Sequence, residues 1–183
     1  RFLRFFSVLF FLLIGFFFFS WETFAQDARS YFYDSIIINI RVNNDSTFDV
    51  EERQIFDYTG RYNKGWRSIP FKDISTITDI EVIDGETGVP LVYSSKKLEK
   101  TNPSSWGKFT YYKSGGAQNI EWYYNLADTK HEWVIKYKVH GGIGFYKDHD
   151  EIYWNLFPDY EVPVLKTKAY VKIPDNNFSL SDF

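Results

Sequence analysis

Apolar and polar residues alternate along most of the chain, and this period of two predicts β-strands. In residues 35–42 every second position is Ile or Val, so one side of an extended chain is apolar. A polar turn at 43–46 follows. Residues 47–58 then resume the alternation, with Phe48 and Val50 on the apolar side. These two segments predict an opening β-hairpin.

Similar patterns recur further along, separated by turn-forming residues. Residues 59–70 contain two glycines and a proline, so we expect no continuous element there. We expect strands at 74–83, 89–93, 107–113, 119–125, 132–140, 151–156 and 164–173, with 89–93 as the hairpin partner of 74–83. No segment shows the period of an amphipathic helix. About nine short strands therefore predict an all-β fold, an antiparallel β-sandwich or barrel, and we favour the sandwich.

The start of the chain is apolar without alternation. Arg1 and Arg4 precede residues 5–19, a run of fifteen residues that holds only Phe, Leu, Ile, Val, one Ser and one Gly. A positive segment followed by a short apolar one is typical of a secretory signal. The run is shorter than the roughly 20 residues that a spanning helix needs. We therefore expect an N-terminal hydrophobic signal helix that exports the rest of the chain.

The residues after this run set the expected domain boundary. Ala25 is a small residue that suits a cleavage point, which would leave Gln26 as the new N-terminus. An uncleaved anchor is the alternative, because Trp21 can extend the apolar run. We expect a signal peptide or signal anchor at 1–25 and an extracytoplasmic β-sandwich domain at 26–183.

Composition narrows the functions that this domain can have. Aromatic residues make up 21% of the chain, whereas Cys and Met are absent. Without Cys the chain forms no disulfide and no thiolate metal site, which favours a bacterial source for an exported domain. The formal net charge is −3, and no tract is strongly basic. Nucleic acid is therefore not an expected partner.

Few residues suggest catalysis. The sequence has no Gly-x-Ser-x-Gly, His-Glu-x-x-His or phosphate-binding glycine motif, so we expect no catalytic residue, cofactor or metal. An acidic cluster at 148–151 would suit a calcium site or a carboxylate-dependent hydrolase, but carboxylates in a turn are usually only solvated. The three histidines, His131, His140 and His149, are nine residues apart, an odd spacing that puts neighbours on opposite faces of one strand.

Aromatic residues offer another kind of site, a surface that stacks on sugar rings. Neighbouring residues of a strand point to opposite faces, so one ring of each adjacent pair is expected in the core. The candidate platform for a glycan consists of Tyr111, Tyr112, Trp122, Tyr123 and Tyr124.

Several short motifs follow one another in a characteristic order. They are Ile-x-Ile-x-Val at 38–42, Phe-x-Val-Glu-Glu at 48–52, Lys-Gly-Trp-Arg-Ser-Ile-Pro at 64–70, an Asp-Gly turn at 84–85, Trp-Asn at 154–155 and Lys-Ile-Pro at 172–174. In this order and spacing they resemble DUF2207, a family of uncharacterised predicted membrane proteins. The resemblance covers about residues 33–174.

The family-like positions are interpreted as structural. They are Glu51, Glu52, Gly65, Trp66, Arg67, Pro70, Trp154 and Asn155. Trp66 departs from the family pattern, in which a smaller aliphatic residue is more usual. Arg67 is expected either to stack on a ring or to form a forked ion pair with Glu51 or Glu52. Such a pair would fix the crossover that follows the opening hairpin.

The resemblance implies an extracytoplasmic β domain that transmembrane helices follow, and it implies no activity. Position 1 is Arg rather than Met, so we expect a piece of a longer protein that is cut, at Phe183, before those helices. The leading hypothesis is a non-enzymatic sensor, interaction or scaffold domain of a membrane-anchored protein, with a protein or a cell-wall glycan as its partner. The alternatives are a carbohydrate- or cell-wall-binding module and, third, a carboxylate-dependent hydrolase.

Overall fold

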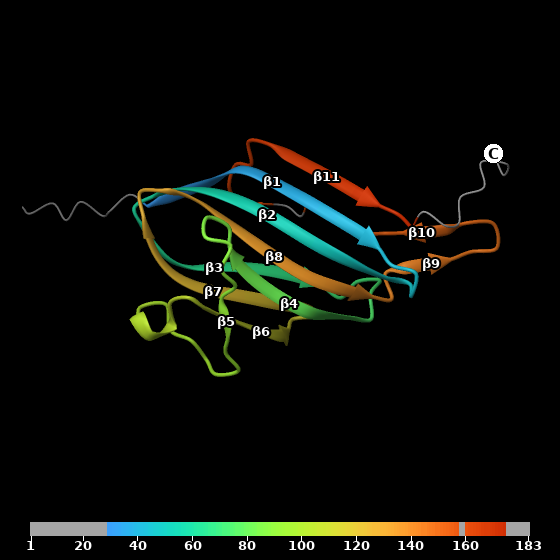
Figure 1. Cartoon of the computed structure of the whole chain (residues 1–183), viewed down its shortest axis with the longest axis horizontal. Coiled ribbons are helices and arrows are strands. Elements are labelled where there is room, and N and C mark those ends of the chain that lie inside the picture. Colours follow the sequence, from blue (N-terminus) through green and yellow to red (C-terminus); the bar gives the residue numbers. More distant parts are fainter. Residues whose placement is uncertain (1–28, 158–159, 175–183) are drawn as a thin grey trace, which may run out of the picture.

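The computed structural model of the chain describes residues 29–157 and 160–174, and almost every regular element in them is a strand (Figure 1). The strands are β1 (Ser30–Val42), β2 (Thr47–Thr59), β3 (Arg61–Pro70), β4 (Thr76–Asp84), β5 (Val92–Tyr93), β6 (Lys108–Ser114), β7 (Ala117–Ala127), β8 (Lys130–His140), β9 (Ile143–Phe145), β10 (Asp150–Ile152) and β11 (Thr167–Lys172). One 3₁₀ turn, η1 (Pro103–Ser105), interrupts them. The all-β prediction is confirmed. The expected signal helix and its cleavage point at Ala25 and Gln26 lie outside the described residues.

The opening hairpin forms the centre of a five-stranded sheet with the order β11-β1-β2-β8-β4. β1 and β2 pair antiparallel, with Ile40 opposite Val50, as the alternation predicts. On β1 the buried side chains include Ile36, Ile38 and Ile40, and on β2 they include Phe48 and Val50. The inner face of this sheet is therefore mainly apolar, with Glu52 and Gln54 as buried exceptions, and its outer face carries the polar residues in between.

A second sheet of four strands, in the order β3-β7-β6-β5, lies against that inner face (Figure 1). The two sheets share one hydrophobic core. Across the interface the hydroxyl groups of Tyr58 and Tyr124 are 2.9 Å apart, and the ring centroids of Trp122 and Trp133 are 6.2 Å apart. Large aromatic side chains thus fill the space between the sheets.

The prediction of an irregular stretch at 59–70 is wrong, because β3 runs through it. Gly60, with a φ of 79°, makes the corner at which the chain leaves the five-stranded sheet for the four-stranded one. Gly65 lies inside the strand, where a Cβ atom would collide with the indole of Trp122. Pro70 ends an edge strand, where a missing N–H group is tolerated. Gly65 therefore allows close packing and Pro70 lies on an edge strand, and neither residue interrupts β3.

The expected hairpin of 74–83 with 89–93 forms only in part. Leu91 donates its backbone N–H to Val82 of β4 at 2.8 Å, but the chain then crosses to the other sheet, where β5 pairs with β6 in parallel. β11 also pairs in parallel, with β1. The sheets are therefore mixed, and the prediction of a purely antiparallel arrangement is wrong. Two-residue periodicity identifies strands but carries no information about their direction.

Residues 143–157 and 160–164 close one side of the core. β9 and β10 form a short hairpin, so the strand expected at 151–156 is shorter and begins one residue earlier. The following segment lies over the core, with the ring of Trp154 edge-on to Phe48 at 5.3 Å. Tyr160 lies against Tyr33, with ring centroids 5.0 Å apart.

Candidate functional site

A buried ion pair joins the two sheets. Glu52 projects inward from β2 and is completely buried, and Arg67 projects inward from β3 and is 7% exposed. Arg67 Nε lies 2.9 Å from Oε2 of Glu52, and a terminal nitrogen of Arg67 lies 2.9 Å from Oε1. Arg67 thus forms the forked pair expected of it, with Glu52 and not with Glu51.

Two further side chains complete the coordination of the Glu52 carboxylate. Tyr137 donates its hydroxyl to Oε1 at 2.6 Å, and Gln54 donates its amide to Oε2 at 2.8 Å. Burial alone would raise the pKa of Glu52, but the Arg67 charge and these hydrogen bonds hold it below its usual value. The carboxylate is therefore ionised and enclosed. This arrangement fits a structural link between the sheets, because Glu52 has no proton to donate and no access to a substrate.

The other family-like positions differ in how far they are exposed. Trp66 points outward from β3 and is 56% exposed. Glu51 points outward from β2, where Arg53 and Lys136 contact it. Trp154, which comes after β10, has its ring centroid 6.1 Å from that of Tyr137. Asn155, next to it, is exposed.

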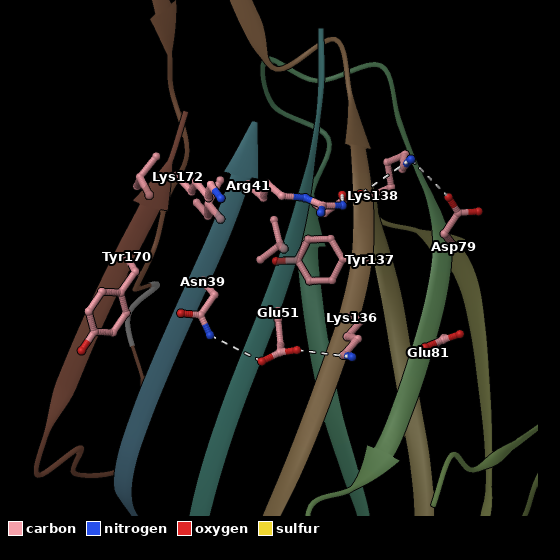
Figure 2. Close-up of a pocket in the computed structure, with 14 residues that line it drawn as sticks. Asn39, Arg41, Glu51, Asp79, Glu81, Lys136, Tyr137, Lys138, Tyr170 and Lys172 are labelled. Atoms are coloured by element: carbon pink, nitrogen blue, oxygen red, sulfur yellow. Dashed lines mark hydrogen bonds and ion pairs between the residues drawn. The ribbon is translucent and has the colours of Figure 1, made fainter. Parts of the chain in front are cut away.

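The outer face of the five-stranded sheet is a shallow polar hollow of about 650 Å³ (Figure 2). Figure 2 shows Glu51 between Asn39 and Lys136, with contacts at 3.4 Å and 3.3 Å. Arg41 contacts Asp49 at 2.8 Å. The lining of the hollow contains four Lys and Arg side chains and four Asp and Glu side chains. Six of these eight charged side chains form ion pairs with one another, which is the ordinary state of a solvated sheet face.

The outer face of the four-stranded sheet is different, because it exposes large aromatic rings. We call it the ring face and define it by Lys64, Trp66, Tyr112, Asn119, Glu121 and Tyr123. Trp66 on β3 pairs in register with Glu121 on β7, and β6 on the other side of β7 contributes Tyr112, which is 45% exposed. The two exposed rings therefore rise from strands on either side of a central carboxylate.

Glu121 is held in place by three donors. Tyr123 donates its hydroxyl at 2.7 Å, Lys64 its ammonium group at 2.9 Å and Tyr112 its hydroxyl at 3.2 Å. Partial burial would raise the pKa of Glu121, but the hydrogen bonds from Lys64 and Tyr123 lower it. Burial and the neighbouring carboxylate raise the pKa of Tyr123. The ring face thus presents a fixed, ionised acceptor between its two rings.

Two adjoining grooves of about 660 Å³ each run along the ring face. Both are lined by Lys64, Tyr112 and Glu121, so they are continuous. Trp66 lines one end, and the loop at 94–106 forms the wall of the other. This loop is fixed by its own hydrogen bonds, since Trp106 donates its indole N–H to the carbonyl of Lys100 at 3.3 Å.

The five rings of the predicted platform do not lie on one surface. Trp122 and Tyr124 point into the core and are 0% and 6% exposed, and Tyr123 is 4% exposed although it lies on the outer side. Tyr111 lies at the sheet edge, stacked on Tyr93 at 4.9 Å. Of these five, Tyr112 alone contributes an exposed ring to the ring face. Alternation turns Trp122 and Tyr124 inward, as expected of one ring in each adjacent pair, and the five candidates did not include Trp66.

The acidic cluster at 148–151 lies at the β9–β10 hairpin. Asp148, Asp150 and Glu151 are exposed, and the only side-chain hydrogen bond found among the described residues for this cluster joins His149 to Asp148 at 3.0 Å. On β8, His131 is buried near Asp84, whereas His140 contacts Thr78. Within residues 29–157 and 160–174, no group of three His, Asp or Glu side chains is placed to hold a metal ion.

The fold defines a class, an all-β domain of two facing sheets. The chain belongs to the DUF2207 family, because the family model described as the N-terminal domain of a predicted membrane protein matches residues 32–182. This confirms the family resemblance of the sequence motifs. Among the described residues, none forms a helix that is long and apolar enough to cross a membrane.

Other comparisons add little. No curated protein matches the chain. A structure of a "putative protease" from Parabacteroides distasonis is similar at 8% identity and a TM-score of 0.33, over 60% of this chain and 23% of that chain. The match thus spans less than a quarter of that protein, and a TM-score this low carries no argument about fold or activity.

Proposed function

We propose that this chain is a non-catalytic β-sandwich domain that a membrane-anchored protein holds outside the cytoplasm, and that it binds its partner through the ring face. The observation that carries the proposal is the exposure of Trp66 and Tyr112 on either side of the fixed Glu121 carboxylate. Trp and Tyr are enriched at binding sites because they combine a large apolar surface with a polar group. The rings of Trp66 and Tyr112 lie on the outer face of the sheet and are not part of the hydrophobic core.

The state of the carboxylates supports a non-catalytic role. A carboxylate-dependent hydrolase needs one carboxyl group that keeps its proton at neutral pH. Within the part of the chain that the structure describes, Glu52 and Glu121 are the two carboxylates that accept hydrogen bonds from tyrosine hydroxyls, and both have lowered pKa values. Neither is therefore suited to donate a proton. We assign the acidic cluster at 148–151 to the solvated surface.

The proposed location rests on the leader and on the family. Residues 1–25 have the order of an export signal, and the family is described as predicted membrane proteins. Alkaline phosphatase fused after residue 174 tests export, because this enzyme is active only outside the cytoplasm. We expect activity with the leader and none after deletion of residues 1–25. Equal activity in both would contradict export.

Photo-cross-linking tests the ring face in cells that produce the full-length protein. A photoreactive amino acid is placed at Trp66, at Tyr112 or, as the control, at Tyr170 on the five-stranded sheet, which is also 56% exposed. We expect discrete adducts from positions 66 and 112 that weaken with Lys64→Ala, and none from position 170. Adducts from position 170 alone would overturn the proposed binding face.

A further inference from the structure

We propose that the partner of the ring face is a neutral, extended glycan chain of β-linked pyranose rings. This inference rests on the proposed function, since it names the ligand class of the same face. It follows from three features of the site: the nature of the exposed rings, the polar groups between them, and the shape of the groove.

The exposed rings suit the apolar faces of sugars. The face of an aromatic ring is electronegative, so it attracts the C–H groups that line one side of a pyranose. Trp66 and Tyr112 project from β3 and β6, which flank β7. Neighbouring strands are about 4.8 Å apart, so the two rings rise from strands roughly 10 Å apart. One pyranose cannot cover both rings, whereas an oligosaccharide can.

The groups between the rings suit sugar hydroxyls. Glu121 is an ionised acceptor, and Lys64 beside it is a donor with hydrogens to spare after its 2.9 Å contact. Ser68, Ser114 and Asn119 line the same groove. The two grooves together are lined by three lysines and two glutamates, so the site carries little net charge: Lys64, Lys97, Lys100, Glu99 and Glu121. A neutral ligand is therefore favoured over a strongly charged one.

The shape of the site favours a chain over a protein surface. The two continuous grooves extend from Trp66 past Tyr112 to the loop at 94–106. A specific protein–protein interface needs about 800 Å² on each partner and a contiguous apolar core. The ring face has instead two rings with hydrophilic side chains between them. A flat, extended β-linked chain fits this sequence of apolar and polar contacts along an open sheet.

The hollow on the five-stranded sheet has the same size but not the same chemistry. Tyr170 is the only aromatic ring in its lining that is strongly exposed (Figure 2). Tyr137, which also lines it, is 2% exposed. This hollow provides no second ring for a chain to stack on. The molecule therefore contains its own control surface.

The test is titration of the full exported chain with cellopentaose and chitopentaose, two neutral β-1,4-linked oligosaccharides, followed by calorimetry and Trp fluorescence. We expect at least one of them to bind and to shift the fluorescence of Trp66. Trp66→Ala should weaken binding at least about tenfold, Trp66→Phe should retain most of it, and Tyr170→Ala should leave it unchanged. Trp66 is exposed, so its variants are expected to fold.

Two results would overturn the glycan proposal: no binding of either oligosaccharide at millimolar concentration, or binding that Trp66→Ala leaves intact. The cross-linking experiment separates this failure from failure of the proposed function. Protein adducts from positions 66 and 112 without oligosaccharide binding would reject the glycan and keep the binding face. If positions 66 and 112 give no adducts and neither oligosaccharide binds, the glycan and the binding face are both rejected.

Discussion

Two glutamates on opposite sides of the four-stranded sheet have almost the same set of partners. Glu52, between the sheets, accepts hydrogen bonds from Arg67, Tyr137 and Gln54. Glu121, on the ring face, accepts from Lys64, Tyr123 and Tyr112. Each combines one cation with at least one tyrosine hydroxyl. They differ in exposure, since the Glu52 side chain is 1% exposed and that of Glu121 is 14% exposed.

β3 supplies the cation to both glutamates. Lys64 and Arg67 are three residues apart on this strand, an odd spacing that places them on opposite faces. An ion pair without access to water is strongly coupled to folding, because loss of one partner leaves a charge in a medium of low dielectric constant. On an open face water replaces the lost partner. The comparison therefore separates a pair that serves stability from one that is available to a ligand.

Arg67→Met should have the largest effect on stability. It leaves the Glu52 carboxylate buried without its cation, and we expect a loss of about 3–5 kcal/mol in the free energy of unfolding. Urea denaturation followed by tryptophan fluorescence measures this loss. The matched control is Arg53→Met, which removes an arginine from the outer face of the neighbouring sheet, where its side chain is 41% exposed, and which should cost less than about 1 kcal/mol.

A double variant distinguishes the ion pair from loss of packing. If the charge of Glu52 causes the effect, Arg67→Met with Glu52→Met should recover much of the stability, because two apolar side chains of similar volume can replace a buried pair. Equal losses in the single and the double variant would show that the cavity and not the charge dominates.

Gly65→Ala should disturb both sides of β3 at once. A Cβ atom at Gly65 would collide with the indole ring of Trp122, so β3 would have to move away from β7. Overpacking of this kind typically costs about 1–3 kcal/mol. Urea denaturation measures this loss, and Trp122→Leu in the same chain should relieve it. If the losses of the two single variants simply add in the double variant, the strain does not arise from contact between residues 65 and 122.

Stability should fall as the pH falls, and Glu52 should contribute more to the loss than Glu121. The pKa of Glu52 is lower in the folded chain than its ordinary value of 4.5. A group of this kind stabilises the fold above its unfolded pKa and loses that contribution as the pH drops below it. We expect the urea midpoint to decrease from about pH 4.5 downward.

Two tyrosine variants assign this decrease to a site. Tyr137→Phe removes a 2.6 Å donor from Glu52, and Tyr123→Phe removes a 2.7 Å donor from Glu121. Both should make the acid-induced loss smaller, because each raises the folded pKa of its glutamate toward the unfolded value. Tyr137→Phe should reduce it more. A larger reduction from Tyr123→Phe would contradict the distinction between the two pairs.

The sequence predicts the buried pair of Glu52 and Arg67 better than it predicts the ring face. Alternation in 35–42 and 47–58 places Glu52 on the apolar side of its strand, and a lone carboxylate among Ile and Val side chains needs a cation. Arg67 could therefore be proposed as its partner. The ring face could not be predicted in the same way, because glycines and Pro70 concealed β3 and with it the outward direction of Trp66. Which strands become neighbours depends on contacts between distant segments, and alternation does not contain that information.

Glu121→Gln should have the smallest effect on stability and still alter the ring face. The amide keeps the volume of the side chain, and water reaches this site, so the loss of the Lys64 contact should cost less than about 1 kcal/mol by urea denaturation. The variant replaces an ionised acceptor by a weaker, neutral one, and the affinity for the oligosaccharide that binds best should decrease. Lys64→Met, which removes the donor instead, is the companion variant. A loss of stability from Glu121→Gln as large as that from Arg67→Met would abolish the distinction, because the carboxylate on the ring face would then be as strongly coupled to folding as the one in the core.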